Sequence, residues 1–251
     1  MNTSYVVAIP SYQRSDVIIE KTLMTLKKKK VSSNSIYIFV ANKTEYKQYI
    51  ENVPSELYNS IIIGKKGISP QRRFISEYFK PGQYIVSLDD DIEEVYRRKS
   101  ETTLSVVRNL DSFFKKAYQD LKKHNLYLWG IYPVKNAFFM QNKVTTDLRF
   151  IIGLLHGYIN RHDQSLYPSP KLKAKDDYDT TLKYYLKDGG VLRYNYISVK
   201  TKFYAPGGIG FENRRTQSKL DKDYLVKTYP EYVSAFQRKD GTDEVRLRDA
   251  S

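Results

Sequence analysis

Short apolar runs alternate with amphipathic stretches over the first 90 residues. Four of these runs end at a proline, a glycine or a polar cluster, which is typical of buried strands. The four runs are Tyr5–Ile9, Ile36–Val40, Ile61–Ile63 and Tyr84–Leu88. Between them, helical spacing and capping residues predict helices from Ser15, over Glu45–Ile50, and from Ser69 and Pro70 to Phe79. Strands that alternate with helices predict an α/β fold with a parallel sheet.

The second half follows a different pattern, with a long amphipathic helix expected over residues 102–124. A further helix over Asp176–Lys187 ends at a glycine pair. Shorter apolar segments predict strands of a mixed region over residues 126–133, 137–140 and 191–202. A glycine-rich loop is expected over Tyr204–Asn213, and the charged tail Lys239–Ser251 is expected to be flexible.

Composition limits the class of protein. With 251 residues and 41% hydrophobic residues, the chain can bury a real core. No window approaches 18 apolar residues and no signal peptide pattern opens the sequence, so we expect no membrane span and a cytoplasmic location, in a host cell if the source is a phage or virus. The absence of cysteine excludes disulfides and thiolate chemistry, and three histidines leave little room for a zinc hydrolase.

The net charge favours a polyanionic partner. The chain has 42 basic and 28 acidic residues, a net charge of +14, and 23 tyrosines. Basic groups interleaved with aromatic rings suit phosphate contact and base stacking, so nucleic acid, an anionic membrane or a nucleotide-linked substrate are candidates. Lysine-rich solvated faces that reflect codon bias are the alternative explanation of the same numbers.

Three consecutive acids, Asp89, Asp90 and Asp91, follow the fourth apolar run. Carboxylates crowded at the end of a strand repel one another, and a hard divalent cation such as Mg²⁺ or Mn²⁺ removes that cost. Mg²⁺ typically takes one or two carboxylates and completes its shell with substrate phosphates. The alternative is an ordinary helix start, where acids favour the helix dipole.

Three other polar clusters contain candidate site residues. Pro10, Ser11, Tyr12 and Arg14 follow the first strand, where open α/β sheets bind ligands. Arg72 and Arg73 lie near a helix N-terminus, which suggests an anionic partner, although a solvated pair is an equal alternative. Asp176 and Asp177 open a helix, where they can act as caps or as a general base with its orienting neighbour.

In this order the four clusters resemble the GT-A glycosyltransferases over about residues 5–200. IPSYQR resembles the opening strand and loop of that fold, SLDDDI its Asp-x-Asp motif, and KDDYD its base segment. The resemblance implies a single Rossmann-like domain of the nucleotide-diphospho-sugar transferase type, with a mixed central sheet over residues 1–251. Residues 1–100 would bind the nucleotide sugar, 101–238 the acceptor, and 239–251 would form the flexible tail.

The same resemblance implies a role for each site residue. The ledge Pro10–Arg14 would hold uridine of a donor such as UDP-glucose or another UDP-sugar, with Arg72 and Arg73 on the diphosphate. Asp89 and Asp90 would approach the ribose, and Asp91 with Asp89 would bind Mn²⁺ or Mg²⁺. Asp177 would be the base of an inverting transfer, assisted by Asp176. Many inverting relatives have glutamate at the position of Asp176, so this chain departs from them there.

A narrower resemblance concerns the acceptor. The short chain, the triple Asp and the basic character are similar to the glycosyltransferases associated with DNA-base hydroxylases, which include the base J glucosyltransferase. It implies transfer to a hydroxymethylated pyrimidine in DNA. Phosphate contacts are then expected from Lys171, Lys173, Lys175, Arg214 and Arg215. The alternatives are a GT-A enzyme that acts on polysaccharide, lipid or protein, and a non-catalytic nucleic-acid-binding protein.

Overall fold

The computed structural model describes residues 4–201 and 211–248, with side chains of the second range described from Arg215 onward. The strands are β1 Tyr5–Pro10, β2 Ile36–Val40, β3 Ser60–Ile63, β4 Tyr84–Leu88, β5 Glu94–Arg98, β6 Leu104–Val106, β7 Leu128–Ile131, β8 Val144–Thr145, β9 Leu155–Ile159, β10 Leu192–Tyr194, β11 Ile197–Lys200, β12 Val233–Gln237 and β13 Asp243–Leu247. The α-helices are α1 Ser15–Ile18, α2 Met24–Lys28, α3 Lys43–Asn52, α4 Ile68–Tyr78, α5 Leu110–His124, α6 Asp176–Asp188 and α7 Phe211–Thr228. A π-helical turn, Ile19–Leu23, joins α1 to α2, and three short 3₁₀ turns are Ser33–Ser35, Ser55–Leu57 and Gln164–Leu166.

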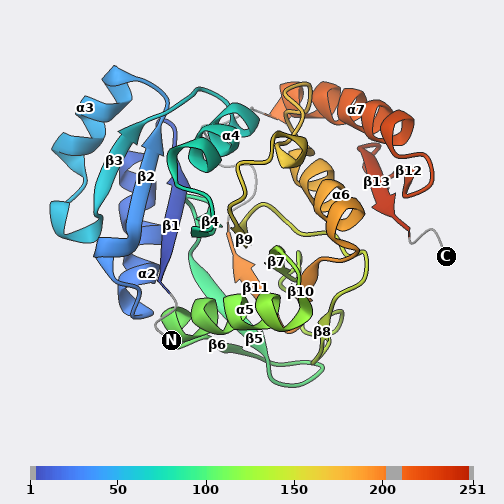
Figure 1. Ribbon diagram of the computed structural model, residues 1–251, viewed down its shortest axis with the longest axis horizontal. Coiled ribbons are helices and arrows are strands. Elements are labelled where there is room, and N and C mark those ends of the chain that lie inside the picture. Colours follow the sequence, from blue (N-terminus) through green and yellow to red (C-terminus); the bar gives the residue numbers. More distant parts are fainter. Residues whose placement is uncertain (1–3, 202–210, 249–251) are drawn as a thin grey trace.

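A mixed sheet of eight strands in the order β3-β2-β1-β4-β9-β7-β10-β8 forms the centre (Figure 1). The first four strands in this order are parallel, whereas β9 runs antiparallel to both β4 and β7. Smaller sheets are formed by β11-β5-β6 and by β12-β13. Because β1 and β4 are parallel neighbours, the residues that follow them meet at the same edge of the sheet.

Alternating side chains of β1 enter two different cores. Val7 and Ile9 belong to a cluster that includes Leu23 and Phe114, from the π-helical turn and α5. Ala8 belongs to a second cluster with residues of α4 and α6, such as Ile75. The alternation follows from the pleat of the strand, which directs successive side chains to opposite faces. The sheet is therefore covered on both faces, as a parallel sheet requires.

The last described elements, α7, β12 and β13, form what we call the C-terminal module (Figure 1). Helix α7 and the β12-β13 hairpin pack together through a third core. Leu225 and Val245 of the module contact this core, which also contains Leu172 and Leu182 from the segment before α6 and from α6 itself. The module is thus attached to the region that holds the acids of α6.

Most of the expected elements are present, including all four N-terminal strands and the helices between them. The long helix begins at Leu110 instead of residue 102, because the side chain of Asn109 accepts a hydrogen bond from the N–H of Ser112 and caps it there. Residues 137–140 form turns and not a strand. The charged composition of the tail predicts flexibility, but β13 pairs with β12 and Val245 is buried.

The expected glycine-rich loop lies largely outside the described residues, and its last three positions belong to α7. The segment 191–202 is divided into β10 and β11 by a turn at Asn195 and Tyr196. Among the described helices, none combines the length and the apolar character needed to cross a membrane.

Candidate active site

The ends of β1 and β4 are joined by buried polar contacts. The Ser11 hydroxyl donates to Oδ2 of Asp90 at 2.6 Å, and Nη1 of Arg14 donates to Oδ1 at 3.0 Å. Asp90 is only 5% exposed, and burial raises its pKa even though these donors oppose the shift. Both oxygens of Asp90 are therefore engaged in fixing the two strand ends to each other.

The two outer acids of the triplet differ in exposure. Asp91 is buried, and its carboxylate accepts from the hydroxyl of Thr201 at 2.6 Å and from Arg14 at 3.4 Å. The side chain of Asp89 is 31% exposed and lies 4.0 Å from Nη2 of Arg72. Partial burial and the neighbouring carboxylates of Asp91 and Asp90 raise its pKa to about 7, against the attraction of Arg72.

This donor set fits a divalent cation that also binds a diphosphate. The described part of the chain contains no group of three or more histidine, cysteine or acidic side chains arranged to hold a metal by themselves. Mg²⁺ needs only one or two carboxylates when phosphates complete its shell. Asp89 has its charged form disfavoured by burial and by the like charge of Asp91, so a cation at this point removes an existing electrostatic cost.

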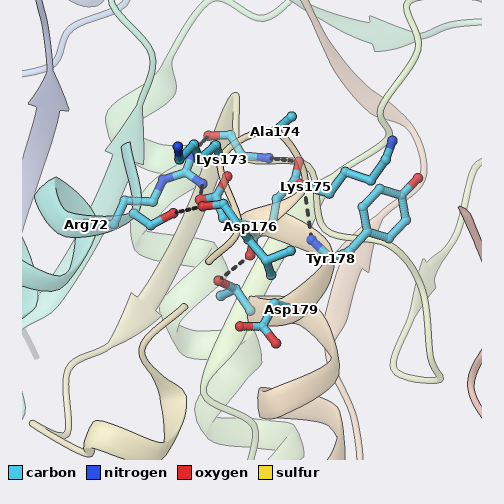
Figure 2. A network of polar contacts seen from close by, with 12 residues as sticks. Arg72, Lys173, Ala174, Lys175, Asp176, Tyr178 and Asp179 are labelled. Carbon is cyan, nitrogen blue, oxygen red and sulfur yellow. Dashed lines mark hydrogen bonds and ion pairs between the residues drawn. The ribbon is translucent and has the colours of Figure 1, made fainter. Parts of the chain in front are cut away.

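Arg72 connects the strand end to the start of α6 (Figure 2). Its Nη1 donates to Oδ2 of Asp176 at 2.5 Å, and its Nη2 donates to the carbonyl of Gly153 at 3.2 Å. A Cβ on Gly153 would lie 2.3 Å from Nη2 of Arg72, so any larger residue would force the guanidinium to shift. Burial opposes the charge of Arg72, yet Asp176 and Asp89 hold its pKa above the ordinary value.

Arg73 does not join Arg72 at the site. Its side chain is 55% exposed and pairs with Glu77 one turn along α4, at 2.8 Å. Successive helix residues point in different directions, so a helix that buries Arg72 directs Arg73 to solvent. Arg73 is not among the residues that line the donor cleft described below, and its contact with the donor diphosphate stays a prediction.

Asp177 lies beside Asp176 at the first turn of α6. The backbone N–H of Gly153 donates to its Oδ2 at 3.2 Å. Burial and the charge of Asp176 raise its pKa to about 7, while Arg72 acts in the opposite direction. A carboxylate with this pKa can accept a proton near neutral pH. Asp176, in contrast, is buried against Arg72, and its contact orients the guanidinium.

A cleft of about 470 Å³ opens beside Asp89 and Asp90. Among the predicted residues, Pro10, Ser11, Tyr12, Arg14, Asp89, Asp90 and Lys173 line it. Sequence reasoning missed several others, including Lys65, Lys66 and Gln71. The Lys66 ammonium lies 5.4 Å from the centre of the Tyr12 ring. The available signal was the polar run GKKG directly after β3, at the same sheet edge as Pro10 and Asp89.

The predicted DNA-contacting residues that the structure describes differ in exposure. Lys171 and Lys173 are exposed. Arg215 is also exposed, and its guanidinium donates to the carbonyl of Asp240 at 2.8 Å. Lys175 is buried and lies 2.5 Å from Glu244 of the C-terminal module, so its ammonium already has an acidic partner away from solvent, which argues against the expected contact with phosphates. The side chain of Arg214 lies outside the described residues.

Asp221 of α7 holds the segment that leads into α6. Its Oδ2 accepts three successive backbone N–H groups, those of Lys173, Ala174 and Lys175, at 3.1, 2.7 and 2.9 Å. Its Oδ1 accepts from Gln217 at 2.7 Å, and the side chain is fully buried. Three N–H groups that converge on one carboxylate form an anion-binding turn, which here fixes the backbone one residue before Asp176.

Comparison with known proteins gives a family and a fold. The family profile of the TET-Associated Glycosyltransferases matches residues 5–208. No curated protein matches the chain significantly. Among solved structures, Staphylococcus aureus TarS 1–349 in complex with UDP-GlcNAc aligns with a TM-score of 0.56 and 16% identity, over 90% of this chain and 66% of that one.

Two further structures are similar at 11% identity. The mannosyltransferase PcManGT from Pyrobaculum calidifontis, in complex with GDP-Man and Mn²⁺, has a TM-score of 0.51 over 90% of this chain and 63% of that one. GalNAc-T7 with UDP, GalNAc and Mn²⁺ has a TM-score of 0.51 over 92% and 51%. This chain spans less than two thirds of the length of each. The expected GT-A-like α/β fold with a mixed sheet is confirmed.

Proposed function

Because the chain belongs to the TET-associated glycosyltransferase family, we propose that it transfers a sugar from a nucleotide-sugar donor, such as a UDP-sugar, to the hydroxyl of a hydroxymethylated pyrimidine in DNA. The proposed transfer is metal-dependent and inverts the anomeric carbon. It requires a donor cleft, a base and an acceptor path that meet at one point.

The observation that carries the proposal is the position of Arg72 between the two groups of acids. Arg72 lies 4.0 Å from Asp89 at the end of β4 and 2.5 Å from Asp176 at the start of α6. This bridge by Arg72 supports the proposal that the cleft beside Asp89 and the carboxylate of Asp177 act as one site, although their residues lie more than 80 positions apart. A diphosphate in this cleft would bring the anomeric carbon towards Asp177.

Asp177 is the proposed general base. Its carboxylate takes the proton from the acceptor hydroxyl, and the hydroxyl oxygen forms a bond to the anomeric carbon. The bond from that carbon to the diphosphate oxygen breaks at the same time, and the diphosphate leaves with the electron pair. Attack opposite the leaving group inverts the anomeric centre. A pKa near 7, caused by burial and by Asp176, supports this role at neutral pH.

Charged groups of the chain stabilise the leaving diphosphate in this proposal. Lys65 and Lys66 line the cleft and supply positive charge to it. Asp89, with Asp91 behind it, would hold Mn²⁺ or Mg²⁺, and the bound ion would neutralise charge that develops on the diphosphate. The ledge Pro10–Arg14 would receive the uridine ring, since it forms one wall of the same cleft.

DNA is the proposed acceptor because of the family and the net charge of +14. A base inside a duplex cannot reach a carboxylate in a cleft, so the hydroxymethylated base has to be extruded or presented in a single strand. The exposed cations Lys171, Lys173 and Arg215 are available for phosphates on the acceptor side, whereas Lys175 is not.

The test is a transfer assay with matched acceptors. The purified protein is incubated with a panel of nucleotide sugars, Mn²⁺ and either DNA that contains hydroxymethylpyrimidine or the same DNA with unmodified bases. The expected result is nucleotide release and a hexose or pentose mass increase on the nucleoside, only with the modified DNA. If nucleotide release depends instead on a polysaccharide, lipid or protein acceptor, the proposed use of a nucleotide-sugar donor stands and the proposed DNA acceptor is wrong.

A further inference from the structure

The segment Gly64–Gly67 joins β3 to α4 and carries two lysines between two glycines. We call it the lysine segment. Lys65 and Lys66 are exposed, and both line the donor cleft together with Asp89. The Lys66 ammonium lies 5.4 Å from the centre of the Tyr12 ring, which belongs to the ledge after β1. The lysine segment therefore brings two positive charges to the cleft that the proposed donor would occupy.

Gln71 of α4 contacts the backbone at both ends of the lysine segment. Its Oε1 accepts from the N–H of Lys65 at 2.6 Å, and its own backbone N–H donates to the carbonyl of Gly67 at 3.0 Å. Its Nε2 donates to the carbonyl of Val40, at the end of β2, at 3.3 Å. The same carbonyl accepts from the N–H of Gly64 at 2.8 Å. Gln71 is only 4% exposed, so one buried residue fixes the segment to the sheet and to the helix.

The two glycines of the segment serve different purposes. A Cβ on Gly64 would lie 2.1 Å from Oε1 of Gln71, so a side chain at this position would push the amide away from Lys65. Gly67 precedes the first turn of α4 with a φ of +93°, a conformation that glycine adopts without strain. The contact between Gln71 and Lys65 therefore depends on the absence of a side chain at residue 64.

We propose that Gln71 is a positioning residue for the donor, which holds Lys65 and Lys66 where they meet the diphosphate of the nucleotide sugar. The proposal rests on the proposed function, because that function supplies the diphosphate. A loose segment would have to be ordered when the anion binds, and contacts that fix its backbone beforehand remove part of that cost. Because Gln71 acts through the segment, its effect on affinity should depend on the presence of the two lysines.

The first test is calorimetric titration of the protein with UDP in the presence of Mn²⁺. Gln71→Met removes both side-chain hydrogen bonds at similar volume and is expected to weaken UDP binding about tenfold, since two lysines then have to be ordered on binding. Gly64→Ala is expected to give a loss in the same direction by displacing the amide. Ser76→Ala is the matched control on α4. It removes a buried hydrogen bond of 2.8 Å to Tyr158 and should keep the wild-type affinity for UDP.

The second test is a double-mutant cycle with Lys65→Ala/Lys66→Ala. In this background, Gln71→Met is expected to change the affinity for UDP by less than about twofold, because groups that act through one another are not additive. Independent effects would instead multiply, and the full tenfold loss would appear again. The same variants are compared by KM and kcat for the sugar donor that the transfer assay identifies. A positioning role raises KM, whereas a purely structural role lowers the melting temperature and kcat and leaves KM unchanged.

Wild-type UDP affinity in both Gln71→Met and Gly64→Ala would overturn the inference, as would an equal loss with Ser76→Ala or a full loss without the lysines. The proposed function fails separately. If UDP binding depends on Gln71 but no sugar reaches DNA, the role of Gln71 stands and the proposed acceptor is wrong. If sugar reaches DNA and Gln71→Met keeps the wild-type KM for the donor, the proposed function stands and the inference about Gln71 is wrong.

Discussion

The candidate site has two edges, which we call the donor edge and the acceptor edge after the roles proposed for them, and they are built in different ways. At the donor edge, Ser11 and Asp90 follow two adjacent parallel strands, and a hydrogen bond of 2.6 Å joins them. At the acceptor edge, the backbone before Asp176 is held by Asp221, which lies more than 45 residues further along the chain. The first edge is a product of the central sheet, and the second depends on a separate helix.

This difference coincides with the limit of the family match. The profile ends at residue 208, and the C-terminal module begins at Phe211. The chain therefore uses elements beyond the matched region to position its proposed base. We expect changes at the donor edge to affect donor and metal binding, and changes at the module to affect turnover.

The largest effect is expected for Asp177→Asn. Turnover should fall by about 10²- to 10⁴-fold, because proton removal is lost, while the dissociation constant of the donor stays near the wild-type value. Single-turnover kinetics and donor titration measure the two quantities. Asp176→Asn is the variant to compare with it, since this change should also weaken the contact between residue 176 and Arg72. If Asp177→Asn retains wild-type turnover, Asp177 is not the base, and Asp176 and Asp177 serve only to stabilise the start of α6.

At the donor edge, Asp89→Asn should weaken Mn²⁺-dependent nucleotide binding at least tenfold and leave the melting temperature nearly unchanged. Asp89 is the most exposed acid of the triplet, and its raised pKa shows a disfavoured charge that a cation could relieve. Asp91→Asn should weaken binding and also destabilise the fold, because the amide keeps one acceptor oxygen in place of two and one of the donors Thr201 and Arg14 then faces an NH₂ group. Calorimetric titration with and without chelator distinguishes the two. Equal Mn²⁺-dependent affinity in wild type and Asp89→Asn would contradict the metal assignment.

At the acceptor edge, Asp221→Ala should lower turnover about tenfold and also lower the melting temperature. Three backbone N–H groups lose their acceptor, at a cost of about 1–3 kcal/mol for each that stays buried. Asp243→Asn is the matched control, since Asp243 pairs with Lys222 inside the module. If both variants lose the same fraction of turnover for the same loss in melting temperature, Asp221 has a structural role and no positioning role.

The smallest effect concerns stability against pH. Burial and Asp176 raise the pKa of Asp177 to about 7, so the folded state favours its protonated form. The associated stability is fully present below the ordinary aspartate pKa near 4 and is lost as the pH rises through about 7. Asp177→Asn has no such charge to bury. Its melting temperature should match the wild type at pH 4 and exceed it by a few degrees above pH 7.5. If the difference in melting temperature between Asp177→Asn and the wild type is the same from pH 4 to pH 7.5, ionisation of Asp177 does not destabilise the folded state.

Local patterns in the sequence were sufficient for much of the donor edge. An apolar run followed by three acids predicts a strand with carboxylates at its end, and β4 with Asp89–Asp91 has this arrangement. The acids at residues 176 and 177 likewise predict the start of a helix, and α6 begins there. These features depend on neighbours in sequence, where periodicity and capping chemistry act directly.

Only the tertiary structure decided which of these groups act together. Arg72 and Arg73 are neighbours in sequence, but Arg72 is buried and lies near Asp89, whereas Arg73 is exposed and pairs with Glu77. The difference arises because successive residues of α4 point in different directions. Lys175 is removed from the surface by Glu244, and Gly153 has a role only because Arg72 passes over it. Contacts between residues that are tens of positions apart produce no recognisable pattern in the sequence, because they depend on how whole helices and strands pack. The sequence determined the acids and the elements that bear them, and packing determined which acid is free to take a proton.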